Sequence, residues 1–308
     1  MSKPKKHHYV SQGYLKFFAQ ENEKGDFIIN VIDKVTGKTF PANITDIAEK
    51  RNFNKIDNGR FIIPTPNGDP LYYEYKYTEL IEGRIPQIIS NIVTSCTLYK
   101  PTAQVLTEEI KHDFATLMVV QLFRTPLSRK FTYEIGEPTC NKVILSIREQ
   151  IELLQDIEKK DQFLSVLDDF KYTEAFSKSF HLQFTTDRER IEKFVQLLVE
   201  NHSWVIYKNM YYKSIPFVTS DNPVVMYNLK SGALGLGVNG LENYTTVISM
   251  PLTPKYMISL YHKSCNFGYY SQSYENKCIA IDEPKFLSNQ SFLQAEQCSR
   301  QIYGFPTL

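Results

Sequence analysis

The chain has 308 residues, of which 42% are hydrophobic and 13% aromatic, and this is enough apolar material for one large domain or two smaller ones. Its formal net charge is +1, so no global field attracts nucleic acid or an acidic membrane, and any contact with nucleic acid has to be local. The five cysteines form no CxxC pair, and neither a signal-peptide pattern nor a membrane-length apolar run occurs, so we expect a cytoplasmic protein without membrane contact.

The first third of the chain is rich in strand signals. The stretch 26–33, DFIINVID, is rich in Ile and Val, and the turn KVTG separates it from KTFPAN, which predicts a β-hairpin. The stretch 45–50, TDIAEK, predicts one helical turn capped by Thr45, and RNFNKID and RFIIP predict a second hairpin around Asp57-Asn58-Gly59. We therefore expect a β-rich part over residues 1–68.

The middle of the chain has helical periodicity. Apolar residues at 80, 81, 85, 88, 89, 92 and 93 predict a helix over 71–97 that Pro86 divides or kinks. A second helix is expected to begin at the N-cap Thr107 and to run to Arg124, before Thr125-Pro126. Further helices are expected over 141–154, 161–169 and 187–201, so residues 69–202 form a helical part.

From Trp204 onward the pattern returns to strands. WVIYKN, PFVTSDNPVVMYN, TTVISMPL and YMISLY are typical of strands, and a helix over 284–296 and a short strand over 300–303 are expected to end the chain. The order of elements argues for an α+β fold and against a doubly wound parallel sheet. We expect a single α+β domain over residues 1–308, whose third part is the β-rich stretch 203–308.

One glycine-rich stretch resembles a dinucleotide fingerprint but lacks its context. GLGVNG places Gly235, Gly237 and Gly240 at GxGxxG spacing. A dinucleotide site needs a strand before this motif and a helix that opens within it, whereas a strand-like segment follows here. The stretch is therefore expected to be a loop.

The most informative local feature is the pair His7-His8 in HHYVSQGYLKFF, behind a basic tail. Histidine titrates near neutral pH and is the commonest nitrogen ligand of metals, so either residue is a candidate general base or ligand. The alternative is a surface pair that closes a first structural element.

Two helices carry further candidates. Gln121 and Arg124 lie one turn apart on an otherwise apolar helix, where Arg124 would hold a phosphate or carboxylate, or would pair with a structural acid. On the preceding helix, Glu79 and Glu82 are also one turn apart, with Glu74 further back. Such carboxylates can share a face and bind a divalent cation together with a histidine, although exposed glutamates are common on helices.

A third candidate lies in PFVTSDNPVV. An apolar strand leads into Thr219, Ser220, Asp221 and Asn222, which places a carboxylate and two hydroxyls at the end of a strand, where sites are often built. The alternative is a turn in which Asp221 only binds nearby backbone amides. The sequence leaves both readings open.

Several of these segments together resemble the bacterial proteins grouped as domain of unknown function 4238. The resemblance rests on HHYVSQGYLKFF, RNFN, TELIEGRI, QLFRTP, PFVTSDNPVV, MPLTPK and FLSNQ, and it extends from His7 to about Tyr303. The family opens with HHYVPQ, so Ser11 stands here where the family usually has Pro. The resemblance names no reaction, but it implies that the polar motif residues belong together: His7, His8, Gln12, Glu82, Gln121, Arg124, Asp221 and Asn222.

These residue types suit phosphoester hydrolysis. We expect a metal-dependent phosphodiester hydrolase, such as a nuclease effector of a bacterial anti-phage defence or toxin system. Its expected catalytic residues are His7, His8, Gln12, Gln121, Arg124 and Asp221. A divalent metal ion is its expected cofactor, held by His8, Glu79, Glu82 and Asp221.

The alternative is a non-catalytic module that binds a nucleotide, a peptide or a partner protein through the same polar residues. Nucleic acid or a nucleotide is one expected partner, and a protein encoded in the same operon is the other. A purely structural role of the polar cluster is the third hypothesis, in which truncating these residues destabilises the protein.

Overall fold

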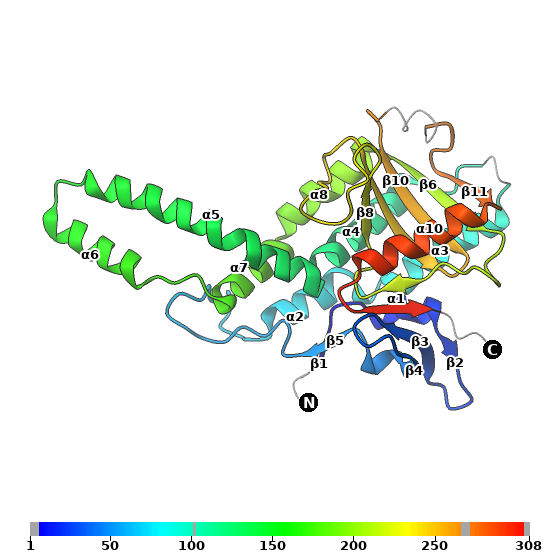
Figure 1. Ribbon diagram of the computed structural model, residues 1–308, viewed down its shortest axis with the longest axis horizontal. Helices are drawn as coiled ribbons and strands as arrows, with labels where there is room; N and C mark the ends of the chain where they lie inside the picture. The colour runs from blue at the N-terminus through cyan, green and yellow to red at the C-terminus, as the bar shows by residue number, and fades with distance from the viewer. Residues whose placement is uncertain (1–5, 101–102, 266–271, 305–308) are drawn as a thin grey trace.

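The computed structural model describes residues 6–100, 103–265 and 272–304, and it has the expected α+β fold (Figure 1). Three sheets and a set of helices share one large hydrophobic core, which includes Val10 near the start of the chain and Tyr303 near its end. Within the described residues, we find no helix with the length and apolar character that crossing a membrane requires.

The largest sheet has five strands in the order β11-β6-β10-β9-β8. Its strands are β6 (His202–Asn209), β8 (Val225–Asn228), β9 (Thr246–Thr253), β10 (Tyr256–His262) and β11 (Lys277–Ile281). All neighbours are antiparallel except β11, which runs parallel to β6. The residues of β9 and β10 are buried almost without a break, because elements cover both faces of the sheet.

A second sheet brings the two ends of the chain together. Its order is β2-β3-β12-β7, with β4 on the other side of β3. The strands are β2 (Gln20–Glu21), β3 (Phe27–Asp33), β4 (Thr39–Asn43), β7 (Thr219–Ser220) and β12 (Gln301–Gly304). The predicted hairpin over 26–43 is confirmed by the pairing of β3 with β4. A third, two-stranded sheet pairs β1 (Lys6–His8) with β5 (Glu49–Arg51).

The helices follow the sequence signals closely. After α1 (Gln12–Leu15), α2 (Tyr72–Tyr77) continues into a π-helical turn over Thr78–Glu82, and α3 (Ile85–Leu98) begins with Pro86 in its first turn, as predicted. The side chain of Thr107 caps α4 (Glu108–Phe123) by accepting the N–H of Ile110. The others are α5 (Pro126–Glu152), α6 (Ile157–Asp169), α7 (Glu174–Thr186), α8 (Arg188–Asn201) and α10 (Pro284–Gln297).

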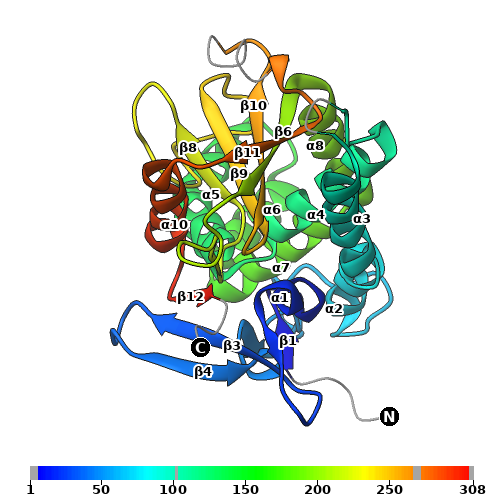
Figure 2. The ribbon, with the colours of Figure 1, turned by 90° about the vertical axis from the view of Figure 1, so that its right-hand side faces the viewer.

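The helices cover the large sheet on both sides, and one pair of helices leaves the body. Figure 2 shows α3, α4 and α8 on one side of the large sheet and α10 on the other. On the first side, Phe114 of α4 contacts Trp204 of β6 with ring centroids 6.2 Å apart. In Figure 1, α5 and α6 form a helical hairpin that projects away from the rest of the molecule.

Some local predictions were wrong, and tertiary contacts explain why. The helical turn near Thr45 is a 3-10 turn over Ile44–Asp46 that Asn43 caps. No strand forms over residues 52–63, so the second hairpin is absent there; the N–H of Asn54 is instead bonded to a histidine ring. The first half of α5, α7 and β11 were not predicted. Of the basic N-terminal tail, Lys3 and Lys5 lie outside the described residues.

Candidate functional site: two polar clusters and a basic cavity

The strand β1 sends the two histidines to opposite sides. It pairs antiparallel with β5 in the register His7 to Lys50 and His8 to Glu49. Because successive side chains of a strand point to opposite faces, the two imidazoles enter different surroundings. The histidine pair is therefore not a single pair of ligands, and each ring has to be considered by itself.

His7 belongs to a buried hydrogen-bonded cluster. Its Nδ1 accepts the backbone N–H of Asn54 at 2.9 Å, and the amide of Asn54 donates to Glu74 Oε2 at 2.7 Å. Arg129 Nη2 donates to Asn54 Oδ1 at 2.9 Å. Glu74 Oε2 also lies 3.5 Å from His7 Nδ1, but an Nδ1 that accepts an amide proton has none to donate, so Asn54 links the two side chains. The imidazole of His7 is fully buried and fixes the segment around Asn54.

His8 lies in the second cluster and is partly exposed. Its Nε2 is 3.2 Å from the side-chain amide of Gln12. Burial lowers the pKa of His8 most, and the positive charge of Arg124 lowers it further, while a hydrogen bond with the backbone of Thr45 and the charge of Glu82 act in the opposite direction. The result is a pKa below the ordinary value, so the ring is neutral at pH 7 and its Nε2 can accept a proton.

Arg124 is enclosed beside His8. It caps the C-terminus of α4, its guanidinium is fully buried, and its Nη2 lies 2.6 Å from Glu82 Oε1. The approach is an ion pair rather than an aligned hydrogen bond, and the guanidinium carbon lies 5.0 Å from the centre of the Tyr77 ring. Its three nitrogens have no aligned hydrogen-bond partner among the described residues. A ligand would reach Arg124 only if the packing around it opened, so the expected phosphate contact is not formed at an open surface.

Gln121 ties α4 to the strand that carries the histidines. One turn before Arg124, its side-chain amide donates to the backbone oxygen of Tyr9 at 2.8 Å, and the side chain is buried. The amide of Gln121 therefore holds the segment at Tyr9 in place, while Arg124 pairs with Glu82. The contact of Gln121 matches the structural alternative, in which the residue positions the N-terminal segment.

Asp221 lies outside the clusters of His7 and His8 and binds backbone amides rather than side chains. Its carboxylate accepts three backbone N–H groups, from Ser299 at 2.7 Å, from Arg300 at 2.7 Å and from Gln301 at 2.9 Å. Burial raises the pKa of Asp221, and these three amides lower it in part. The neighbouring Asn222 donates to the backbone oxygen of Gln297 at 3.1 Å. The TSDNP segment thus anchors the chain between α10 and β12 through amides that are distant in the sequence, rather than through the nearby amides of a local turn.

The four expected metal ligands are dispersed. Glu79 is an exposed residue whose Oε2 accepts from Lys76 at 2.8 Å, Glu82 pairs with Arg124, and Asp221 binds backbone amides. Only His8 and Glu82 share one cluster. Within residues 6–100, 103–265 and 272–304, no group of three or more His, Cys, Asp or Glu side chains is arranged to hold a metal ion.

A cavity of about 630 Å³ opens on the described surface beside the cluster around His7. Cationic side chains dominate its lining and only two carboxylates, Asp57 and Glu174, offset them. The six cationic residues are Lys50, Arg51, Lys55, Arg129, Lys130 and Lys178. Apolar and aromatic side chains form the rest of the wall, among them Phe53, Ile56, Ile62 and Tyr133. We call this site the basic cavity.

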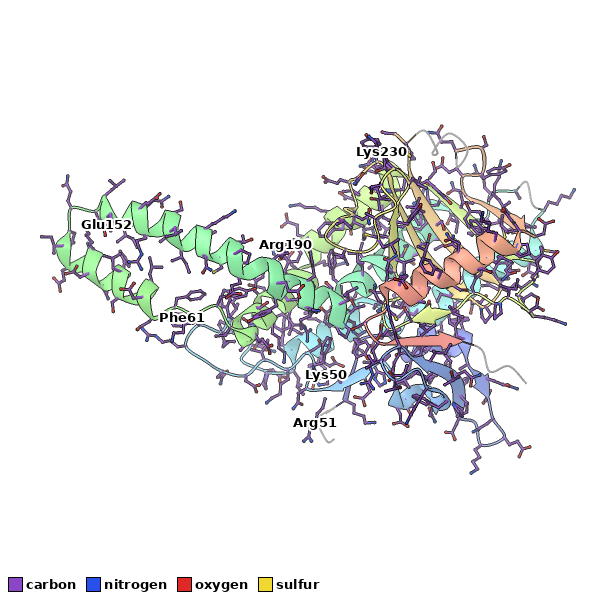
Figure 3. All side chains as sticks on the ribbon, viewed as in Figure 1. Lys50, Arg51, Phe61, Glu152, Arg190 and Lys230 are labelled. Carbon is purple, nitrogen blue, oxygen red and sulfur yellow. The ribbon has the colours of Figure 1, made fainter. Side chains whose placement is uncertain are left out.

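Three segments far apart in the sequence build the basic cavity. The strand β5 and the residues after it supply Lys50, Arg51 and Lys55, the first turns of α5 supply Arg129 and Lys130, and α7 supplies Lys178. Figure 3 labels Lys50 and Arg51 at the lower edge of the body, close to the start of the projecting hairpin. The cluster around His7 holds two of these segments together, since Asn54 bridges His7 and Arg129.

The charges in the basic cavity are crowded. The guanidinium carbon of Arg129 lies 3.6 Å from the centre of the Phe53 ring, and burial lowers the pKa of Arg129 to about 10. Burial, followed by the positive charge of Arg129, lowers the pKa of Lys178 to about 8, although the carboxylate of Asp57 acts against this. Among the described residues, no carboxylate lies within ion-pair distance of Lys50, Arg51, Arg129 or Lys178. An anion bound here would relieve the repulsion.

The sequence did not point to this cavity. Its cations are distributed over positions 50–55, 129–130 and 178 in a chain of net charge +1, so that none of them forms a charge cluster in the sequence. The one available signal was Lys50-Arg51 beside RNFN, together with Lys55. Each of these residues alone is typical of a solvated surface.

The fold and the site define an α+β protein with a buried polar cluster around His7, a partly exposed one around His8, and a basic cavity. Residues 6–307 match the family described as protein of unknown function (DUF4238), which is nearly the whole chain. The chain belongs to this family, as the motifs had indicated. Comparison with curated proteins and with solved structures gave no match.

Proposed function

We propose that the protein binds a phosphate-bearing ligand, a nucleic-acid strand or a nucleotide, in the basic cavity. The observation that carries this proposal is the lining of six cationic side chains, four of which have no carboxylate within ion-pair distance among the described residues. Burial, followed by the charge of Arg129, lowers the pKa of one of these four, Lys178, to about 8. Folding places these like charges together at a cost, and a bound polyanion would offset it. With a net charge of +1, the chain attracts such a ligand locally rather than through its overall field.

The walls of the cavity support a nucleotide rather than a bare anion. Its volume of about 630 Å³ lies in the ordinary range of small-molecule sites. The partly exposed Tyr133 lines it next to the cations, whereas the ring of Phe53 is already covered by Arg129. An aromatic ring beside positive charge is how proteins bind unpaired nucleotides, through stacking and phosphate contacts. Arg51 would supply the forked donor that matches phosphate oxygens, whereas the guanidinium of Arg129 already donates to Phe53 and Asn54 and contributes its charge.

The proposal is tested by binding of a labelled single-stranded oligonucleotide of about twelve nucleotides, measured by fluorescence anisotropy at about 50 and 200 mM salt. We expect binding that weakens steeply with salt, and we expect Arg51→Glu to weaken it about 10-fold or more and to reduce the salt dependence. Lys230→Glu is the matched control, because Lys230 is exposed and lies on the opposite edge of the molecule in Figure 3. Equal affinities of the two variants would contradict the proposal.

Hydrolysis of a phosphodiester is the second candidate, and the state of His8 favours it. A general base has to be unprotonated at the working pH, and the lowered pKa and partial exposure of His8 meet that requirement. In such a reaction water attacks phosphorus while His8 Nε2 takes its proton, after Gln12 has released that nitrogen. The P–O bond to the leaving sugar oxygen breaks in the same step, and that oxygen takes a proton from the protonated His8 or from solvent. A metal ion, if it takes part, would meet Glu82 beside His8. The role of a nuclease effector in the bacterial cytoplasm stays a prediction.

The two candidates separate in one assay. The oligonucleotide is incubated with the protein with Mg²⁺, with Mn²⁺ and with EDTA, and its products are resolved on a denaturing gel. His8 does not line the basic cavity, so hydrolysis requires a strand that extends from the cavity to His8. It predicts cleavage that His8→Ala abolishes while Arg51→Glu weakens it through binding. Binding without cleavage in every condition would leave the cavity as a recognition site and remove the hydrolase.

A further inference from the structure

The projecting hairpin carries an apolar surface that its own chain does not cover. The two helices contact each other, and the ion pair between Arg148 and Asp168 bridges them. The partly buried Ile144 and the buried Ile151 of α5 and the partly buried Leu164 of α6 mark the seam between them. Among the described residues of α6, none is buried. The hairpin therefore has only half of the core that a helical bundle usually has.

A second apolar stripe lies next to this seam. On α5 it follows positions 136, 140, 143, 147 and 150, which alternate in steps of four and three as in a coiled coil, and position 154 just after the helix continues the series. On α6 the corresponding positions are 156, 159, 163, 166 and 170. The apolar side chains Val143, Ile147, Phe163 and Val166 are 51%, 39%, 47% and 45% exposed. The only charges in both series, Asp156 and Lys159, pair with each other at 3.1 Å.

The stripes of the two helices lie on the same face of the hairpin. On α5, Val143 immediately precedes the seam residue Ile144, and on α6, Phe163 immediately precedes the seam residue Leu164. Because α5 and α6 are antiparallel, the same rotation away from their shared seam points to the same side of the pair. The four exposed side chains therefore form one face, while Leu145, which is also exposed, points to the other side.

Near the body, this face is already packed by the chain itself. A Cβ at Gly136 would collide with the hydroxyl of Tyr172, and Phe61 contacts Phe170 with ring centroids 5.3 Å apart. The stripe is thus a packing surface where the chain reaches it, and beyond Cys140 it continues uncovered. This continuity indicates that the outer part is also built to be covered.

We propose that a second copy of this chain covers the outer part, with the two hairpins packed face to face as an antiparallel four-helix bundle. Four apolar side chains without an unpaired charge can pack against the same four side chains of a second copy, whereas a charged face would repel its own copy. The antiparallel arrangement places the two bodies at opposite ends, since each hairpin projects well beyond its body (Figure 1).

The size of the face agrees with a dimer of moderate strength. Each helix presents about 20 Å of length at 1.5 Å per residue, and two such helices on each copy bury on the order of 1,200 Å² in total, the lower end of specific interfaces. We therefore expect a reversible dimer with a dissociation constant in the micromolar range. This inference does not depend on the basic cavity or on the proposed function.

The test is sedimentation of the full chain between about 1 and 100 μM, a range that spans micromolar affinity. We expect a reversible monomer–dimer equilibrium, and we expect Ile147→Glu and Phe163→Glu each to weaken it about 100-fold or more by burying a charge in the interface. Leu145→Glu is the control, because it adds the same charge to an exposed residue on the opposite side of the hairpin. Circular dichroism checks that each variant keeps its helices.

Three results would overturn the inference. One is a wild-type chain that stays monomeric over the whole range, another is a dimer that persists in Ile147→Glu and Phe163→Glu, and the third is a Leu145→Glu variant that dissociates as readily as Ile147→Glu.

Discussion

The carboxylate of Asp221 offers a direct test of structural against catalytic roles in the TSDNP motif. In Asp221→Ala, the N–H groups of Ser299, Arg300 and Gln301 lose their acceptor. A hydrogen bond to a charged group contributes roughly 1.5–3 kcal/mol. Because Ser299 and Arg300 are exposed, hydrogen bonds to water replace part of the lost interaction. The variant also avoids the cost of burying the carboxylate, which is the effect that raises the pKa of Asp221. We expect a net loss of about 3 kcal/mol.

Urea unfolding at pH 7, followed by circular dichroism, measures this loss against a control. Glu79→Ala is suitable, because Glu79 is an exposed carboxylate paired with Lys76 at the surface, and we expect it to cost less than about 0.5 kcal/mol. A residue that only served catalysis would behave differently, since removing it costs little stability. An Asp221→Ala variant within about 1 kcal/mol of the wild type would therefore refute the anchoring role and restore Asp221 as a candidate site residue.

Three further predictions follow from buried or crowded charges. Because the pKa of Lys178 is about 8, the affinity for the oligonucleotide should fall about 3- to 10-fold between pH 7 and 9. Lys178→Arg stays charged over this range and should remove the pH dependence. The same pH dependence in the variant as in the wild type would argue against binding in the basic cavity. Burial lowers the pKa of His181 to about 3 and that of His202 to about 4, so the unfolded chain takes up protons first as the pH falls below 6.5. Each ring should therefore reduce the unfolding free energy by up to about 1.4 kcal/mol per pH unit down to pH 4. Urea unfolding at pH 6.5 and at pH 5 should show a smaller difference in this free energy for His181→Gln than for the wild type. Finally, Glu82→Gln leaves the buried charge of Arg124 without its counter-ion and should lower the unfolding free energy by about 3 kcal/mol. The double variant with Arg124→Met should recover most of this loss. Additive losses of the two single variants in this double-mutant cycle would contradict the pairing.

The helices were predictable where the signals that end them are local. Thr107 is a side-chain cap at the start of α4, and Pro86 separates α2 from α3, so both boundaries follow from a few neighbouring residues. The segment 52–63 was not predictable in this way. It has the composition of a hairpin, but Asn54 gives its N–H to His7, which lies 47 positions earlier in the chain. The pairing that competes with the hairpin is thus a long-range one.

The candidate site was only partly predictable for a similar reason. Some motif residues do come together: His8 contacts Gln12, Arg124 pairs with Glu82, and the charges of this pair act on His8. The alternation of β1 separates His7 from this group. The basic cavity could not be predicted, since its cations come together only when β5, α5 and α7 do.

The most direct test of the central claim is to map where a nucleic acid touches the protein. A single-stranded oligonucleotide with photoreactive bases is crosslinked to the full chain, and the modified peptides are identified by mass spectrometry. Binding in the basic cavity predicts crosslinks within residues 50–57, 126–133 and 174–178, with Tyr133 as the stacking position. Crosslinks confined to other surfaces, such as that around Lys230, or their absence at concentrations that saturate binding, would contradict the claim.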